Sequence, residues 1–280
     1  TTEAGKLGTW TNQVYWSNYA FSLFSNFTLY KDDPIHGDEI HQYENRNMLG
    51  LNSSLKNDYR LFGRTLKTNV GAGYRGDFID NIGLAHVEKR EFLNDVKKGS
   101  IHENNINGFA DASLLISSRL TLNLGLRYDY FTFLYKSSID DTSSANRGQG
   151  IASPKINIYY KLTQALQLYA SGGYGFHSND ARVSVYKTTQ SSLPRAKSVD
   201  LGTNAKIGNK LFVNMALWYM YLESEYVYVG DDGLLEPSGS TRRMGIDMSF
   251  RYQLAKWLFA DMDLNLAKPR YINLPRNENY

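Results

Sequence analysis

Hydrophobic and polar residues alternate with a period of two along many short stretches of this chain. In the clearest stretch, one parity holds Leu120, Leu122, Leu124, Leu126, Tyr128 and Tyr130, and the other holds Thr121, Asn123, Gly125, Arg127 and Asp129. Because successive side chains of a strand point to opposite faces, this period predicts a strand with one apolar face. The pattern recurs at residues 66–74, 166–176, 199–207, 211–221 and 244–252.

Weaker versions of the same alternation lie at residues 15–29, 49–55, 106–116, 152–162 and 258–266, which gives about eleven predicted strands. In several strands the apolar row ends in aromatic residues, as in Leu217, Tyr219 and Tyr221. No stretch approaches the roughly 20 consecutive apolar residues that a transmembrane helix requires. Strands that meet lipid with every second residue give a much weaker hydropathy signal. The pattern therefore predicts an all-β protein, an antiparallel transmembrane β-barrel.

The predicted connections between strands alternate between short and long. The short ones lie near residues 57–64, 117–119, 161–165, 208–210 and 253–256. The long ones lie at residues 31–39, 79–105, 136–150, 178–196 and 223–240. Short periplasmic turns and long extracellular loops are typical of outer-membrane barrels, in which every second residue along each strand faces a polar interior. We therefore expect all the long loops at one end of the barrel.

Composition changes this picture only at a few points. The chain has 280 residues and a mean hydropathy of -0.45, which keeps a soluble all-β protein as the alternative. The 21 Tyr outnumber the 13 Phe and 4 Trp, and rings with a polar tip suit a membrane–water interface. A net charge of +3 is too small over this length to indicate nucleic-acid binding. With 0 Cys, neither disulfides nor a cysteine-based zinc site is available.

Two features predict that residues 1–280 form only part of a barrel. An unclosed sheet in lipid leaves unpaired backbone groups at both edges, which costs several kcal/mol for each group. About eleven strands is also an odd number, whereas bacterial single-chain barrels have even counts. We therefore expect that the terminal strands of the barrel lie outside this sequence.

Several local sequences resemble the barrel of TonB-dependent receptors, most specifically over residues 151–271. The segments that carry the resemblance are 152–155, 175–182, 193–196, 199–202, 217–230, 240–247 and the turn around Trp257 with Asp261, Asp263 and Asn265. Such receptors are barrels of about 22 strands with a plugged lumen. The resemblance implies that residues 1–280 are about half of a C-terminal β-barrel domain. The plug domain and the TonB box have no counterpart in this sequence.

The resemblance also implies a function, which is import of a scarce solute such as a ferric siderophore or another metal chelate across the bacterial outer membrane. The implied partners are outer-membrane lipid, a plug domain of the same chain, a TonB-type energy-coupling protein and the chelate, with no nucleic acid and no cofactor. A passive porin-like channel is the alternative. An outer-membrane enzyme is a third hypothesis, for which His177 and Asp180 are the pair to test.

Candidate ligand contacts are His177, Arg182, Arg195 and Arg243. The five histidines, His36, His41, His86, His102 and His177, all lie in or beside predicted loops or strand ends. Their spacing matches no metal-ligand motif, so no metal site is predicted, and His177 is preferred because its parity faces the interior at the barrel mouth. Arginines at the mouth can attract an anionic ligand, although ordinary solvated charges are the simpler interpretation. The acidic residues Glu223, Glu225, Asp231 and Asp232 fall in an exposed loop, so no catalytic residue is predicted.

Two further interpretations concern the inward-facing parity. The sequence GAGYRG at residues 71–76 matches the dinucleotide-binding pattern, but it lies inside an alternating strand, and that pattern requires a strand, a turn and a helix. Its glycines are better explained as small interior positions that allow close approach of other groups. Hydrogen bonds and ion pairs in the lumen are predicted for Asn123, Arg127, Asp129, Asp247, Arg251, Asp261 and Asp263.

Overall fold

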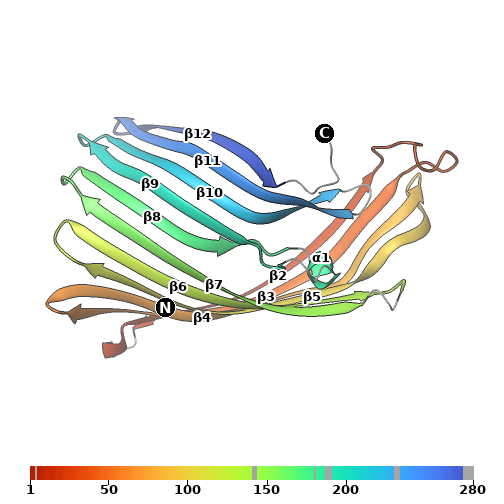
Figure 1. Cartoon of the computed structure of the whole chain (residues 1–280), viewed down its shortest axis with the longest axis horizontal. Helices are drawn as coiled ribbons and strands as arrows, with labels where there is room; N and C mark the ends of the chain where they lie inside the picture. Colours follow the sequence, from red (N-terminus) through yellow and green to blue (C-terminus); the bar gives the residue numbers. More distant parts are fainter. Residues whose placement is uncertain (4, 141–143, 180, 187–190, 230–233, 274–280) are drawn as a thin grey trace.

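The computed structural model describes residues 1–3, 5–140, 144–179, 181–186, 191–229 and 234–273, and it forms one antiparallel sheet (Figure 1). The strands are β1 (Thr2–Glu3), β2 (Thr9–Ser25), β3 (Ile40–Leu61), β4 (Arg64–Glu88), β5 (Glu91–Leu115), β6 (Leu120–Ser137), β7 (Ala145–Lys161), β8 (Leu166–Phe176), β9 (Arg195–Ile207), β10 (Leu211–Val229), β11 (Leu234–Ala255) and β12 (Leu258–Asn273). A 3-10 turn (Gly5–Leu7) and the short helix α1 (Ala181–Tyr186) complete the elements. Among these residues, no helix is both long and apolar enough to cross a membrane.

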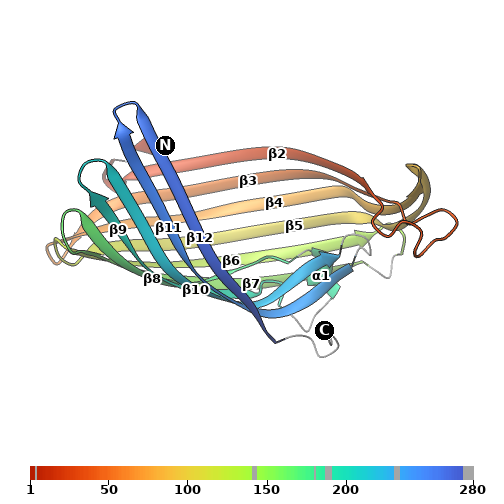
Figure 2. The same ribbon diagram turned by 90° about the horizontal axis from the view of Figure 1, so that it is seen from above.

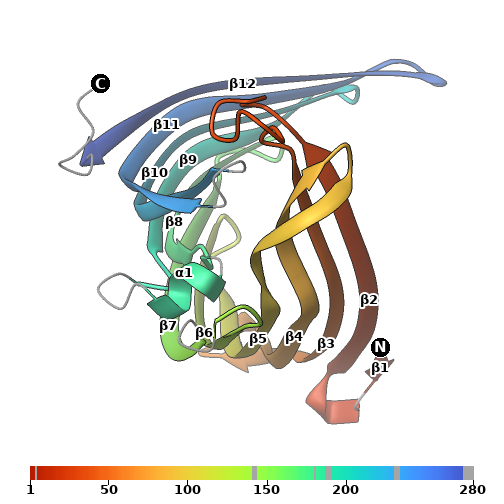
Figure 3. The ribbon, with the colours of Figure 1, turned by 90° about the vertical axis from the view of Figure 1, so that its right-hand side faces the viewer.

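The sheet order follows the chain from β1 to β12, so that every strand pairs with its sequence neighbours. Seen from above, the strands run side by side in a twisted sheet (Figure 2). Seen end-on, the sheet curves around an interior in which α1 lies (Figure 3). Within the described residues, β1 and β12 are the two edges of the sheet and do not pair with each other. The all-β, antiparallel prediction is therefore confirmed, with the eleven long strands β2 to β12 at the predicted places.

The two faces of the sheet follow the predicted parity. On β6, Leu126 is 55% exposed on the outer face, whereas Asp129 is 0% exposed on the inner face. The aromatic residues at the end of the same outer row, Tyr128 and Tyr130, are exposed as well. An apolar row that faces outward along a curved sheet, with polar residues inside, is the pattern of a membrane-spanning barrel wall.

Several strands are longer than the sequence pattern predicts. Residues 79–105 are not a loop, because β4 and β5 continue to a tight turn at Lys89 and Arg90, where φ is 49° and 69°. The register of this hairpin shifts between Ile79 and Ile82 and at two later places. A β-bulge moves the following residues to the other face, so the period of two disappears from the sequence although the strand continues. In the same way, β10 and β11 extend into residues 223–240, which were predicted as a loop.

The buried core of the described residues lies inside the curve of the sheet, at the end that carries the long connections. It consists of Ile79, Ile101, Phe131, Phe133, Tyr135, Ile151, Ala181, Val185 and Leu193. Residues 178–196 are predicted as an external loop, but among the described residues of this segment Ala181, Val185 and Leu193 pack against the inner wall. The inward-facing side chains of β4 to β7 are apolar beyond Asp77 and Asp129, and burying them under this segment removes them from water.

The glycines of residues 71–76 lie in β4, and no helix follows them. A Cβ atom on Gly71 would come within 2.7 Å of the Phe109 ring, and one on Gly73 would come within 2.6 Å of Asn52 Oδ1. These glycines therefore make room for neighbouring inward side chains, as predicted. The dinucleotide-binding interpretation is excluded by the strand context.

Candidate functional site

A cavity of about 420 Å³ lies against the inner wall of the sheet, below the inward-folded segment. The neighbouring strands β3 to β6, the end of β8 and the residues that follow it line the cavity. The lining residues are Arg46, Arg75, Asp77, Ile79, Ile101, Glu103, Asn105, Arg127, Asp129, Phe131, Phe176, Ser178, Asn179 and Ala181. Polar residues form its wall, and apolar residues form the side next to the buried core.

The wall is built from Arg–Asp pairs two residues apart on one strand, so that both side chains face inward. On β4, Arg75 donates to Asp77 from Nη2 at 2.9 Å and from Nε at 3.2 Å. On β6, Arg127 donates to Asp129 from Nε and from Nη2, both at 2.7 Å. Two parallel charge-assisted hydrogen bonds fix each guanidinium in one orientation.

All four residues line the cavity, and in both pairs the arginine is more exposed than its carboxylate. The side chain of Arg75 is 50% exposed and that of Asp77 is 11% exposed. The side chain of Arg127 is 46% exposed and that of Asp129 is 0% exposed. The carboxylates neutralise the arginines, but the groups that a bound molecule would meet first are guanidinium N–H donors. Planar donors of this kind suit carboxylate and phosphate groups.

Amide side chains on β5 extend the network between the two pairs. Asn105 donates from Nδ2 to Asp129 Oδ1 at 3.1 Å, and Asn107 donates from Nδ2 to Asn105 Oδ1 at 3.1 Å. A buried carboxylate needs several donors to stay charged without a large desolvation cost, and Asp129 has them from Arg127 and Asn105. The predicted lumen network is thus confirmed for Arg127 and Asp129.

The inward-folded segment forms the roof of the cavity and is held by hydrogen bonds to β7 and within itself. Gln149 donates from Nε2 to Ser191 Oγ at 2.7 Å and accepts the Ser192 N–H at 2.7 Å. Arg147 donates to the carbonyl oxygen of Ser184 at 3.1 Å. Because Leu193 is fully buried against the wall, the roof combines polar anchors with apolar packing.

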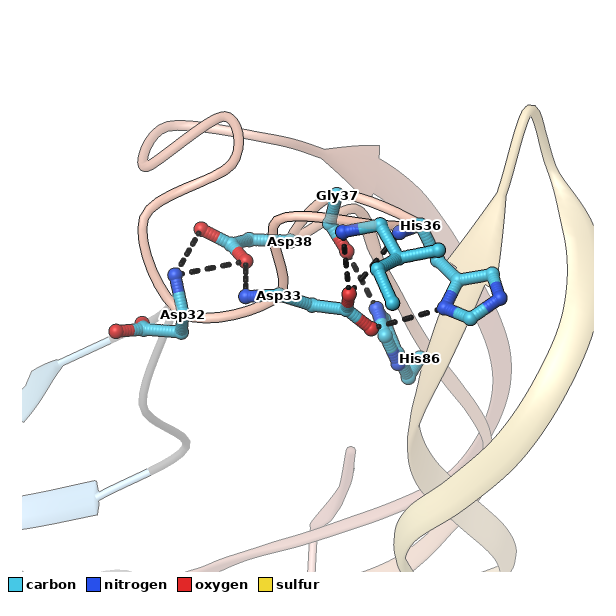
Figure 4. A network of polar contacts seen from close by, with 7 residues as sticks. Asp32, Asp33, His36, Gly37, Asp38 and His86 are labelled. Atoms are coloured by element: carbon cyan, nitrogen blue, oxygen red, sulfur yellow. Dashed lines mark hydrogen bonds and ion pairs between the residues drawn. The ribbon is translucent and has the colours of Figure 1, made fainter.

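The loop between β2 and β3 forms a second polar network at the same end of the sheet (Figure 4). Asp33 accepts backbone N–H groups of Ile35 at 2.9 Å and His36 at 3.0 Å, and its Oδ2 lies within hydrogen-bond distance of His36 Nδ1 at 3.1 Å. The N–H bonds from His36 and Ile35 lower the pKa of Asp33 from 3.8 to about 2. His86 on β4 donates from Nε2 to the Gly37 carbonyl oxygen at 2.6 Å, which ties this loop to the sheet.

Asp38 closes the other end of this loop. Its carboxylate accepts the backbone N–H groups of Lys31 at 2.8 Å and Asp33 at 2.7 Å. Desolvation acts to raise the pKa of Asp38, but the hydrogen bonds from Asp33 and Asp32 outweigh it and leave the pKa below its ordinary value. The loop is therefore shaped by its own carboxylates.

The four predicted ligand contacts do not come together at the cavity. His177 follows β8 with an exposed side chain, and its N–H donates to the Pro194 carbonyl oxygen at 3.1 Å. Arg182 is half-buried on α1. Arg195 opens β9 with an exposed side chain, and Arg243 is half-buried on the inner parity of β11. None of the four lines the cavity, and their role as ligand contacts stays a prediction.

Other candidates of the sequence analysis are placed as follows. Asp180 lies outside the described residues, as do the side chains of Glu225, Asp231 and Asp232. His41 stacks on Phe24 with ring centres 4.1 Å apart, and His102 pairs with Asp80 at 3.4 Å. Within the described part of the chain, no group of three or more histidine and acidic side chains is arranged to hold a metal ion.

The remaining predicted lumen residues lie farther along the sheet. Arg251 and Asp261 approach each other to 4.0 Å across β11 and β12, and Asp247 and Asp263 line a smaller hollow of about 350 Å³. The sequence reasoning missed Arg46, Arg75, Asp77 and Asn105 as cavity residues. The repeated Arg-x-Asp spacing on one parity, at residues 75–77 and 127–129, was the signal available for two of them.

Comparison with known proteins adds an independent line of evidence. Residues 3–274 match the family model described as TonB dependent receptor-like, beta-barrel. No curated protein matches the sequence.

Several solved structures share the fold. The structure is similar to the ferric citrate transporter FecA in its unliganded form, with a TM-score of 0.74, 16% identity, and coverage of 95% of this chain and 42% of that one. The copper transporter OprC has a TM-score of 0.68 and 18% identity, with coverage of 95% of this chain and 44% of that one. The siderophore receptor PiuA from Acinetobacter baumannii has a TM-score of 0.69 and 12% identity, with coverage of 93% of this chain and 44% of that one. The chain therefore spans less than half the length of these proteins, and the likeness shows a common fold.

Proposed function

Because this chain belongs to the TonB-dependent receptor family, in the part that forms the β-barrel, we propose that it is part of the wall of an importer of anionic metal chelates. The receptor would lie in the bacterial outer membrane and take up a ferric siderophore or a similar chelate. The chain would belong to a C-terminal β-barrel domain whose other strands and plug lie elsewhere in a longer protein. A TonB-type protein would supply the energy.

The observation that carries this proposal is the difference in exposure within the Arg–Asp pairs of the cavity. The guanidinium groups of Arg75 and Arg127 are about half exposed, while Asp77 and Asp129 are mostly buried. Chelates that hold ferric iron through carboxylate or catecholate oxygens carry negative charge, and guanidinium groups recognise such oxygens with two hydrogen bonds. Two of the similar structures are a ferric citrate transporter and a siderophore receptor, which supports the same class of ligand.

A passive channel is the competing function, and the inner wall argues against it. Ala181, Val185 and Leu193 pack against the inner wall, and Ser178, Asn179 and Ala181 line the cavity on the interior side of the sheet. The family and the similar structures are receptors and transporters, and this also speaks against an enzyme. We therefore favour energy-dependent import without bond-making chemistry.

Uptake of radioactive iron by cells that make the full-length receptor tests the proposal. Ferric citrate and a ferric catecholate would be supplied in turn, with and without the proton gradient. We expect gradient-dependent uptake of one of them, with an Arg75→Gln variant needing about tenfold more chelate for half-maximal uptake, equivalent to about 1.4 kcal/mol of binding. Arg64→Gln, at the short-turn end of β4, is the matched control.

The outcomes separate the alternatives. Uptake of neither chelate, or equal loss in both variants, would contradict a chelate site at this cavity. Gradient-independent passage of small neutral solutes would indicate a passive channel. Heat-modifiable migration in gels checks that each variant is folded, which matters because Asp77 loses its partner in Arg75→Gln.

A further inference from the structure

Asn179, the third residue after β8, lines the cavity and carries a buried side-chain oxygen without a partner. The residue is only 3% exposed. Among the residues that the structure describes, no group donates a hydrogen bond to its Oδ1 atom. A carbonyl oxygen that loses water on folding without gaining a donor costs free energy, and such atoms are rare in native proteins. An unpaired acceptor on a residue that lines a cavity points to a ligand that supplies the donor.

Three hydrogen bonds hold Asn179 in place and fix the orientation of its amide group. Nδ2 donates to the Ser191 carbonyl oxygen at 3.2 Å, and because that partner is an acceptor, the remaining atom of the amide is the oxygen. The backbone N–H of Asn179 donates to the Ser192 carbonyl oxygen at 3.1 Å, and its carbonyl oxygen accepts a bond from Ser184 Oγ at 3.4 Å. The acceptor is therefore positioned before a ligand binds, which reduces the entropic cost of binding.

The charged residues that line the cavity balance one another, so charge alone does not select the ligand. They are three arginines and three acidic residues, namely Arg46, Arg75, Arg127, Asp77, Glu103 and Asp129. The half-exposed guanidinium groups can bind anionic oxygens, but all chelates of carboxylate or catecholate type offer such oxygens. Discrimination among anionic chelates needs a group that contacts another part of the molecule. Asn179 supplies such a group from the roof of the cavity.

The nature of Oδ1 and of the neighbouring rings indicates what this other part is. An amide oxygen is a neutral acceptor, which suits a neutral donor such as a hydroxyl group. The rings of Phe131 and Phe176, two residues that line the same cavity, meet edge-to-face with centres 5.7 Å apart. Aromatic rings pack favourably against further rings in such arrangements. The cavity thus combines donors for anionic oxygens, an aromatic surface and one acceptor for a hydroxyl group.

We propose that Asn179 determines ligand specificity by accepting a hydrogen bond from a hydroxyl group, not bound to the metal, of an aromatic chelate whose anionic oxygens contact Arg75 and Arg127. The inference rests on the proposed import of anionic chelates and deepens it, because it selects chelates with a catechol-type ring and a side hydroxyl. A ligand with this hydroxyl satisfies the buried oxygen, whereas an analogue without it leaves the oxygen unpaired and binds more weakly.

Two ferric complexes that differ only in this hydroxyl test the proposal on the purified full-length receptor in detergent. They are the complexes of dihydroxybenzoyl-serine and dihydroxybenzoyl-alanine, which have the same charge and the same iron-binding oxygens. Equilibrium dialysis with radioactive iron gives the dissociation constant of each complex. The ratio of the two constants is the decisive quantity, because a general loss of folded receptor does not change it.

The test variant is Asn179→Ala, which removes the acceptor. The matched control is Asn123→Ala, since Asn123 is also a buried asparagine of the interior but does not line the cavity. We expect the unaltered receptor to bind the serine complex about tenfold more tightly than the alanine complex, as one hydrogen bond of about 1.4 kcal/mol provides. The ratio should fall below about twofold in Asn179→Ala and stay near tenfold in Asn123→Ala.

Each other outcome would overturn the proposal. Equal binding of the two complexes by the unaltered receptor, or binding of neither, would show that the cavity does not select this hydroxyl. Equal weakening of both complexes in Asn179→Ala, with the ratio preserved, would show that the residue only supports the roof. The import proposal is tested separately, because loss of ferric citrate uptake in Arg75→Gln would uphold it even when the serine and alanine complexes are not distinguished.

Discussion

The first half of the sheet, β2 to β7, and the second half, β8 to β12, use the same outer apolar pattern but differ in how their polar groups are satisfied. Inside the first half, Phe133 is 1% exposed, and the carboxylates of the two Arg–Asp pairs are 11% and 0% exposed. Inside the second half, Phe212 is 50% exposed and the side chains of Arg251 and Asp261 are mostly in the open. One half has a packed interior, and the other presents an inner surface.

The difference follows from where the chain supplies covering residues. The segment after β8 brings Ala181, Val185 and Leu193 against the first half. No described segment covers the inner face of β10 to β12 in the same way. Buried polar groups need partners, so the first half has to satisfy them internally, whereas those of the second half stay available to solvent or to another part of the protein. The first half therefore provides a preformed cavity, and the second half provides an inner surface that is open to contact.

Phenylalanine truncation is the sharpest test of this comparison. Phe133→Ala should lower the free energy of unfolding by about 3–5 kcal/mol, because it leaves a cavity among Ile101, Phe131 and Leu193 that the rigid sheet cannot close. Phe212→Ala on the inner face of β10 should cost less than about 1 kcal/mol. Denaturant unfolding of the full-length receptor in detergent, followed by the heat-modifiable band, measures both.

Two outcomes of this experiment would contradict the contrast between a packed first half and an open second half. A similar loss for Phe212→Ala would mean that another part of the full-length receptor covers the second half as tightly as the roof covers the first. A small loss for Phe133→Ala would mean that the roof does not pack on the wall in solution. Lys206 Nζ lies 5.7 Å from the centre of the Phe212 ring. Loss of this contact explains why a small decrease in stability is expected for Phe212→Ala.

Replacing one inward-facing asparagine in each half tests how the polar groups of the two halves are satisfied. The expected loss of unfolding free energy is smaller than for Phe133→Ala. Asn123 in the first half donates to Asp111 Oδ1 at 2.9 Å and Ser113 Oγ at 2.8 Å, and it accepts a bond from Asn157 at 2.7 Å. Asn123→Ala should cost about 1–3 kcal/mol, because it removes three hydrogen bonds of a buried side chain whose partners are only partly accessible to water.

The matched variant is Asn214→Ala, which replaces an exposed asparagine on the inner parity of β10. We expect a change within about 0.5 kcal/mol in the same unfolding experiment. Equal losses for the two variants would show that the inner walls of the two halves are covered alike, and the comparison would not hold for polar groups.

The sequence predicted most of the fold because alternation is a local property. The rows of Leu120 to Tyr130 and of Leu211 to Tyr221 lie in unbulged, regularly paired strands, and each was assigned to its correct face. The prediction failed where pairing became irregular. In residues 79–105 the register shifts exchange the faces, and a test for strict alternation then finds no strand.

The candidate site was less predictable because its parts are brought together by pairing across strands. Arg75 and Arg127 are 52 residues apart in sequence, and their common cavity depends on the register of β4, β5 and β6. The inward packing of Ala181, Val185 and Leu193 was also hidden, because these apolar residues show no periodicity of two. Ranking arginines by their nearness to predicted loops therefore selected Arg182, Arg195 and Arg243 and left out Arg75.

The smallest expected effect concerns acid, which should loosen the loop between β2 and β3. The pKa of Asp33 is lowered from 3.8 to about 2 by N–H bonds that only the carboxylate form accepts well. A group whose pKa is lowered on folding stabilises the loop above its ordinary pKa, and this contribution is lost as the pH falls from about 4 to about 2. A fluorophore on Ile35→Cys, at an exposed position of the loop, should therefore show decreasing anisotropy over that range.

The chain offers a control loop that is held in the same way by a group that does not titrate. Ser137 Oγ accepts the N–H groups of Ile139 at 3.2 Å and Asp140 at 3.1 Å, as Asp33 does for Ile35 and His36. The same fluorophore on Ile139→Cys should keep its anisotropy between pH 4 and pH 2, because a hydroxyl oxygen accepts these bonds at any pH. Asp33→Ala, which has no side-chain acceptor, should lower the Ile35 signal already at neutral pH. If both loops loosened together, acid would be acting on the sheet as a whole, and the carboxylate of Asp33 would not be what fixes this loop.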